Sequence, residues 1–115
     1  MVTDFHSHIL PGIDDGSKSL EMSIEMLRME AEQGIGHVVA TPHFYPQYDT
    51  PERFLERRAA AENALREEMR NHADLPGFSV GAEVYYFPGI SDSKAVSQLT
   101  IDQTPYILVE MPTSP

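Results

Sequence analysis

Two histidines stand one residue apart near the start of the chain, in the stretch HSHILPGIDDG. The segment Val2–His8 is short and rich in apolar residues, which is typical of a buried strand. Side chains two residues apart on a strand point to the same face, so His6 and His8 project together from positions about 6.6–7 Å apart. Two imidazoles on one face can converge on a metal ion, although such pairs also occur on exposed strands. The pair alone is therefore weak evidence for a metal site.

Further imidazole and carboxylate side chains stand at the ends of the other predicted strands. These strands and residues are His37–Thr41 with His43, Phe78–Tyr85 with Glu83, and Tyr106–Glu110 with its last residue, Glu110. The carboxyl ends of parallel strands meet at one edge of a sheet, where α/β proteins build their sites. Nitrogen and oxygen ligands without sulfur suit manganese, iron, zinc or magnesium. Because this set exceeds what one ion needs, the sequence predicts a centre of two or more metals.

The loop ILPGIDDG contains the proline and glycines needed to turn the chain back over the strand ends. Such a turn brings Asp14 or Asp15 near the metals. The other aspartate is expected to form an Asx turn or to cap the helix that follows. Asp4 lies two residues before His6 on the same face of the strand, so it is expected to orient an imidazole.

Several other polar and aromatic residues receive a structural interpretation. His37 begins a strand away from the predicted site, and His72 lies at a helix end, where a partly charged imidazole suits the dipole. Five aromatic residues follow the ligand positions: Phe44, Tyr45, Tyr48, Tyr85 and Tyr86. They either line a pocket for an aromatic substrate or pack at its rim, and packing is the default interpretation.

The segments that position these side chains alternate between strand and helix character. Ser17–Gln33 has a helical pattern, with Ser17 or Ser19 able to cap its start and Gly34 its end. Thr50, followed by proline, begins a second helix that runs to about residue 71. Strand–helix–strand–helix–strand predicts an α/β fold with a parallel sheet. With no helix after the last strand, the chain resembles the front portion of a larger barrel.

Composition excludes several function classes. The chain has 115 residues, enough for one domain with a modest core, and no cysteine. Disulfides, cysteine-ligated zinc and a cysteine nucleophile are therefore excluded together. Eighteen acidic and eight basic residues give a net charge of −10, which disfavours nucleic acid and anionic lipid as partners. With no apolar run of membrane-spanning length and no signal-peptide pattern, a cytoplasmic protein without membrane insertion is expected.

Together, the motifs HSHILPGIDDG, ATPHF and GAEVYY resemble those of the PHP (polymerase and histidinol phosphatase) superfamily in their residues and in their order along the chain. More narrowly, they are similar to the manganese-dependent protein-tyrosine phosphatases of bacterial capsule and exopolysaccharide operons. The resemblance covers essentially the whole chain. It implies a TIM-like, distorted (β/α)7 barrel, of which residues 1–115 form a single partial domain with the first strands and helices.

The resemblance also implies a ligand set for up to three metals. His6 and His8 would hold one ion, Glu83 would bridge it to a second, His43 and Glu110 would help hold the second, and Asp15 would serve a third. Manganese is the expected ion, with iron, zinc and magnesium as alternatives. The family's remaining ligands come from strands beyond this part of the barrel.

The implied substrate is the phosphotyrosyl tail of a bacterial tyrosine kinase that controls polysaccharide export. A metal-bound hydroxide would attack phosphorus directly, so no protein nucleophile is needed. One alternative is a small-molecule phosphoesterase such as a histidinol-phosphate phosphatase. Another is a non-catalytic metal-binding fragment, favoured by the incomplete ligand set. An unpaired Tyr106–Glu110 edge is further expected to cause self-association.

Overall fold

The computed structural model describes residues 2–87, 98–101 and 106–111. Its elements, in chain order, are β1 (Val2–Ser7), α1 (Leu20–Glu32), β2 (Ile35–Ala40), β3 (His43–Phe44), α2 (Pro51–Met69), β4 (Gly77–Val80), β5 (Glu83–Tyr85) and β6 (Leu108–Glu110). The expected α/β alternation is confirmed. Neither described helix has the length and apolar character that crossing a membrane requires.

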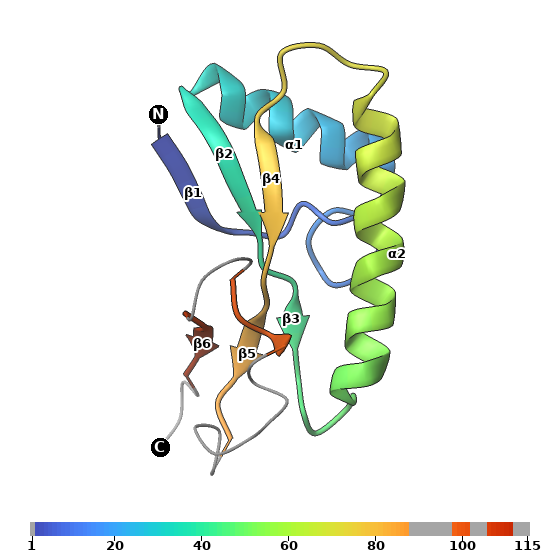
Figure 1. Ribbon diagram of the computed structural model, residues 1–115, viewed down its shortest axis with the longest axis vertical. Coiled ribbons are helices and arrows are strands. Elements are labelled where there is room, and N and C mark those ends of the chain that lie inside the picture. The colour runs from blue at the N-terminus through green and yellow to red at the C-terminus, as the bar shows by residue number, and fades with distance from the viewer. Residues whose placement is uncertain (1, 88–97, 102–105, 112–115) are drawn as a thin grey trace.

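The strands form two parallel three-stranded sheets, with the orders β1-β2-β4 and β3-β5-β6. In Figure 1 the first sheet lies above the second along the long axis of the molecule, and α2 runs beside both. Along the chain, β3 follows β2 after a short break, and β5 follows β4 in the same way. Within each sheet, neighbouring strands are arranged in their order along the chain.

The prediction of one continuous strand over Phe78–Tyr85 is wrong, because the structure divides this segment into β4 and β5. The break falls at Gly81, whose N–H donates to the carbonyl of Ala40 at 2.8 Å. A Cβ at Gly81 would lie 3.2 Å from Ile101, which is tighter than most Cβ contacts, so a larger residue would require this neighbour to shift. On the adjacent strand the break falls at Pro42, which has no N–H for a strand ladder. The two interruptions stand side by side and separate the sheets.

Both helices begin at the side chains that the sequence offers as caps. Ser19, rather than Ser17, caps α1 by accepting a hydrogen bond from the N–H of Met22 at 3.1 Å. Thr50 caps α2 in the same way, and Pro51 occupies its first turn. Gly34 follows α1 with φ at +85°, which favours glycine and ends the helix as expected.

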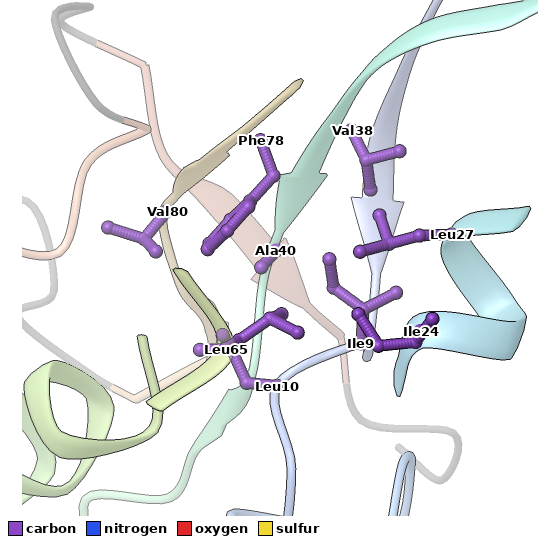
Figure 2. Close-up of a cluster of buried hydrophobic side chains, with 9 residues drawn as sticks. All are labelled: Ile9, Leu10, Ile24, Leu27, Val38, Ala40, Leu65, Phe78 and Val80. Atoms are coloured by element: carbon purple, nitrogen blue, oxygen red, sulfur yellow. The ribbon is translucent and has the colours of Figure 1, made fainter. Parts of the chain in front are cut away.

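A main hydrophobic core joins the first sheet to both helices (Figure 2). Its buried members are Ile9, Leu10, Ile24, Leu27, Val38, Ala40, Leu65, Phe78 and Val80. A second cluster lies against the lower sheet and contains Phe44, Phe54, Ala82, Val84 and Leu99. Helix α2 contributes Leu65 to the first and Phe54 to the second, both fully buried. This helix therefore holds the two sheets in a fixed relation.

An irregularity in β1 changes the face to which its side chains point. Asp4 pairs with Val38 and Ser7 pairs with Ala40, so β1 has one more residue than β2 over this interval. Asp4 consequently shares the helix-facing side with Val38 and lies near Glu30 of α1. Its Oδ1 also accepts the backbone N–H of His6 at 3.0 Å. The expected contact of Asp4 with an imidazole was wrong, because the extra residue separates their faces.

In the described part of the chain each sheet has two edge strands, β1 and β4 in the first and β3 and β6 in the second. The side chains of Val2 and Phe5 on β1 are among the exposed large apolar residues. Unpaired strand edges of this kind template association, and self-association of the chain stays a prediction.

Replacing Glu30 by glutamine is expected to remove a pH-dependent destabilisation. Burial and the neighbouring Asp4 raise the pKa of Glu30 from 4.5 to about 7. Because the folded pKa is the higher one, this group's favourable contribution is complete below pH 4.5 and is lost as the pH rises towards 7. In urea unfolding, Glu30→Gln should gain stability relative to wild type at pH 8 and gain little at pH 4.5. The exposed control Glu32→Gln should show no such difference, and equal behaviour of both variants would contradict the prediction.

Truncating Leu65 is expected to destabilise the protein strongly. Its side chain is fully buried in the main core, so Leu65→Ala should cost about 2–5 kcal/mol of unfolding free energy. The volume-conserving Leu65→Met should cost less than about 1.5 kcal/mol. Chemical denaturation followed by circular dichroism measures both. A small cost for both variants would show that α2 is not anchored through this residue.

Candidate metal centre

Three overlapping groups of histidine and carboxylate side chains meet where the strands end. They are His6, His8 and Glu83; His8, Asp14 and His43; and His43, Glu83 and Glu110. Within each group the candidate ligand atoms all lie within 4.8 Å of one another. Three residues, His8, His43 and Glu83, each belong to two groups. The arrangement is therefore one continuous cluster rather than three separate ones.

The carboxylate of Glu83 is the centre of the first group. Its Oε1 lies 2.5 Å from Nε2 of His6 and 3.1 Å from Nε2 of His8, and the two Nε2 atoms are 3.2 Å apart. The residue is only 8% exposed. Its backbone N–H donates to the carbonyl of Pro42 at 2.9 Å, which ties the start of β5 to the neighbouring strand. Two nitrogens and one oxygen thus converge on a single point, as ligands of one cation do.

Asp14 orients the second group from the loop after β1. Its Oδ2 lies 2.9 Å from Nδ1 of His8 and accepts the backbone N–H of His43 at 3.1 Å. The hydrogen bond that His8 donates to Asp14 raises the pKa of His8. Burial of Asp14 opposes ionisation, but hydrogen bonds from His8, Gly16 and His43 lower its pKa. With Asp14 as the acceptor, Nδ1 of His8 carries the proton and Nε2 is left to bind a cation.

The loop is held over the strand ends by backbone hydrogen bonds, as its turn residues predict. The N–H of Ser17 donates to the carbonyl of His8 at 3.0 Å, and the N–H of Gly12 donates to the carbonyl of Ser17 at 2.9 Å. A Cβ at Gly16 would lie 2.4 Å from both the Cβ and the carbonyl oxygen of His8, so no larger residue fits there. This close contact brings Asp14 against the imidazole.

Asp15 stands in a different environment from Asp14. Its Oδ1 is 3.6 Å from Nε2 of His43, and its side chain is 85% exposed. Asp15 lies outside the three groups, whereas Asp14 lies within one. The turn residues left Asp14 and Asp15 as alternatives, and the family resemblance implied Asp15 as the ligand of a third metal. The structure brings Asp14 into the cluster, through the buried turn beside Gly16.

The third group contains two buried polar atoms without hydrogen-bond partners. Nδ1 of His43 and Oε1 of Glu110 are 3.2 Å apart, but they lack the geometry of a hydrogen bond. Nδ1 of His43 is also 3.8 Å from Oε2 of Glu83. Buried groups of this kind are costly when unsatisfied, and a cation between them would satisfy both. The donors present therefore fit a divalent metal bound by nitrogen and oxygen.

Stacked rings support the imidazoles from the side. The ring of His8 stacks on that of His43 at 4.5 Å, and the ring of Tyr45 also stacks on His43, at 5.3 Å. Burial and the negative charge of the nearby Glu110 raise the pKa of Tyr45. Sequence reasoning did not identify Tyr45 as a support for a ligand, although its position two residues after His43 was a signal.

The two remaining histidines lie outside the cluster. His37 shares a hydrogen bond of 2.9 Å with the hydroxyl of Ser79, and His72 lies 3.0 Å from Glu68 on the same helix. Neither belongs to a ligand group. Both positions agree with the structural interpretation.

Known proteins are similar to this chain in sequence and in fold. The family model for capsular polysaccharide synthesis, CpsB/CapC, matches residues 2–115. The tyrosine-protein phosphatase YwqE of Bacillus subtilis strain 168 is 35% identical over 113 residues, covering 95% of this chain and 42% of YwqE. The tyrosine-protein phosphatase CpsB of Streptococcus pneumoniae is 34% identical over 111 residues, covering 93% of this chain and 44% of CpsB.

A solved structure of the same group of phosphatases is also similar to this chain. It comes from work on YwqE and CpsB from these two species, described as unique metal-dependent tyrosine phosphatases. It matches with a TM-score of 0.80 and 31% identity, covering 96% of this chain and 44% of the solved chain. This chain thus spans less than half the length of its relatives. On the evidence of the family model, the relatives and the shared fold, the chain belongs to the CpsB/CapC family of capsular polysaccharide synthesis.

Proposed function

We propose that this chain forms the first part of a metal-dependent phosphatase that hydrolyses phosphotyrosine. The observation that carries the proposal is the continuous cluster in which His8, His43 and Glu83 are each shared between ligand groups. The names of its relatives YwqE and CpsB, both tyrosine-protein phosphatases, support the choice of substrate. The substrate protein is the phosphotyrosyl tail of a bacterial tyrosine kinase that regulates capsule synthesis, a role consistent with the family's description.

The proposed architecture is the opening of a distorted (β/α)7 barrel, with residues 1–115 as one partial domain. The parallel order of successive strands in both sheets supports this architecture. In barrels of this type the site lies where the carboxyl ends of the strands meet. The ligand cluster occupies the corresponding place here, at the ends of β1, β2 and β4 and in the second sheet.

The proposed ligands would hold up to three cations. His6, His8 and Glu83 hold one, while Glu83, His43 and Glu110 hold the second. Asp15 is the proposed ligand of a third, because its carboxylate is near His43 and open to solvent. Manganese is the proposed ion, and iron, zinc and magnesium are chemically compatible with the same donors. When bound, such cations supply Lewis-acid chemistry and lower the pKa of water.

The chain's own residues prepare the site for an anionic substrate. Asp14 fixes the imidazole of His8 so that its Nε2 faces the cluster. Tyr45 stacks against His43 and holds that ring against His8. The chain has no cysteine to act as a nucleophile, and its net charge of −10 favours bound cations, because metals or local arginines must offset the repulsion of a phosphoryl group. These features favour direct hydrolysis over a covalent phosphoenzyme on sulfur.

Replacing Asp14 by asparagine is expected to weaken metal binding. The variant loses the negative charge and one of the two acceptor oxygens, which now bond His8, His43 and Gly16, so the support of His8 weakens and the affinity for Mn²⁺ should fall about 10- to 100-fold. Isothermal titration calorimetry with MnCl₂ measures the change. The matched control is Asp74→Asn, at an exposed position outside the cluster, and it should bind as wild type does. Equal affinities in all three proteins would show that Asp14 does not support the centre.

Hydrolysis of a phosphotyrosyl peptide is expected to depend on metal and not on thiols. Exhaustive chelation should abolish phosphate release, Mn²⁺ should restore it, and iodoacetamide should have no effect because no cysteine is present. Full activity after chelation contradicts the proposal. Faster hydrolysis of histidinol phosphate would favour a small-molecule phosphoesterase instead. Metal binding without any turnover would indicate a non-catalytic metal-binding fragment.

A further inference from the structure

A cavity of about 520 Å³ adjoins the ligand cluster. It lies between the loop after β1, the segment that follows β3 and the first turns of α2. Its lining residues are Ile13, Asp14, Asp15, His43, Tyr45, Tyr48, Asp49 and Arg57. We propose that this cavity binds the phenyl ring of the phosphotyrosine and that Tyr48 selects aryl over alkyl phosphate esters. The inference rests on the proposed function.

The cavity leads from ligand side chains to aromatic ones. His43 and Asp14 line it at the cluster, and Tyr45 stacks on His43 with an angle of 18° between the rings. The ring of Tyr48 meets that of Tyr45 edge to face, at 6.4 Å and 67°. An aromatic surface therefore extends outward from the place where a phosphoryl group would bind. A ring attached to that group would enter the cavity and contact these two tyrosines.

The exposure of Tyr48 indicates an unused contact surface. Tyr48 is 82% exposed, whereas the neighbouring Tyr45 contacts the rings of His43 and Tyr85. When a second ring covers an exposed aromatic side chain at the edge of a cavity, both the buried apolar area and the ring–ring contact contribute to the free energy of binding. The volume is also sufficient, because an apolar cavity of about 150 Å³ already accommodates benzene.

Arg57 holds the outer end of the cavity in place. Its guanidinium pairs with the carboxylate of Asp49 and donates to the carbonyl of Ile13 at 3.4 Å. These contacts tie α2 to the loop that carries Asp14 and Asp15. The cavity is thus formed before any ligand arrives, which lowers the cost of ordering its walls on binding.

The charges of the cavity favour an uncharged ring over a second anion. Asp14, Asp15 and Asp49 contribute three carboxylates, against the single guanidinium of Arg57. A phosphoryl group is repelled here and would bind at the cations of the cluster instead. The competing occupant is a cationic substituent, such as the ammonium group of an aminoalkyl phosphate, which the same carboxylates would attract.

Binding of phosphonates to the Mn²⁺-loaded chain tests the inference without requiring turnover. Benzylphosphonate carries an aryl group, methylphosphonate lacks one, and 2-aminoethylphosphonate carries an ammonium group. In calorimetry, wild type should bind benzylphosphonate about 10-fold more tightly than methylphosphonate. Tyr48→Ala should lose about 3- to 10-fold in affinity for benzylphosphonate and nothing for methylphosphonate or Mn²⁺. Tyr48→Phe keeps the ring and should retain the preference.

The matched control is Tyr86→Ala, which removes an exposed tyrosine that does not line the cavity. It should bind all three phosphonates as wild type does. Equal affinity of wild type for benzyl- and methylphosphonate overturns the aryl site while leaving the phosphatase proposal intact. Tighter binding of 2-aminoethylphosphonate, unaffected by Tyr48→Ala, overturns it in favour of a cationic substrate. If the metal binds but no phosphonate does, the proposed function fails and the aryl site fails with it.

Discussion

Burial of the Glu83 carboxylate is the constraint around which the candidate site is built. A carboxylate that is only 8% exposed is costly unless positive or hydrogen-bonding groups surround it. His6 and His8 approach one of its oxygens, and His43 lies near the other. Imidazoles compensate this charge when protonated, and a divalent cation does so more completely. The same carboxylate that would destabilise an empty core thus favours a metal at this position.

Departures from regular strand geometry deliver the side chains to that carboxylate. The extra residue in β1 moves His6 to the face opposite Asp4, and Pro42 and Gly81 interrupt two neighbouring strands at the same level. Without those interruptions, strict alternation would send successive side chains to opposite faces of one continuous sheet. Irregularities of this kind often lie beside functional sites because they re-aim side chains.

Helix α2 supplies the rigidity that the interrupted sheet lacks. Leu65 and Phe54 anchor it in separate clusters, one against each sheet. Two of its arginines also donate to carbonyls near the break, Arg58 to Gly81 at 2.8 Å and Arg66 to Phe78 at 3.1 Å. The helix therefore connects the half of the fold that carries His6 and His8 to the half that carries Glu83.

The sequence by itself determined the alternation of helices and strands, the helix starts at Thr50 and after Ser17, and the donor types available for a metal. Local patterns suffice for these features, because capping, periodicity and turn chemistry depend on residues close together in the chain. Only the tertiary structure decided that Asp14 rather than Asp15 lies inside the cluster, and that Asp4 faces the helix. Both outcomes depend on contacts between distant segments and on one extra residue in a strand, and no local pattern encodes either.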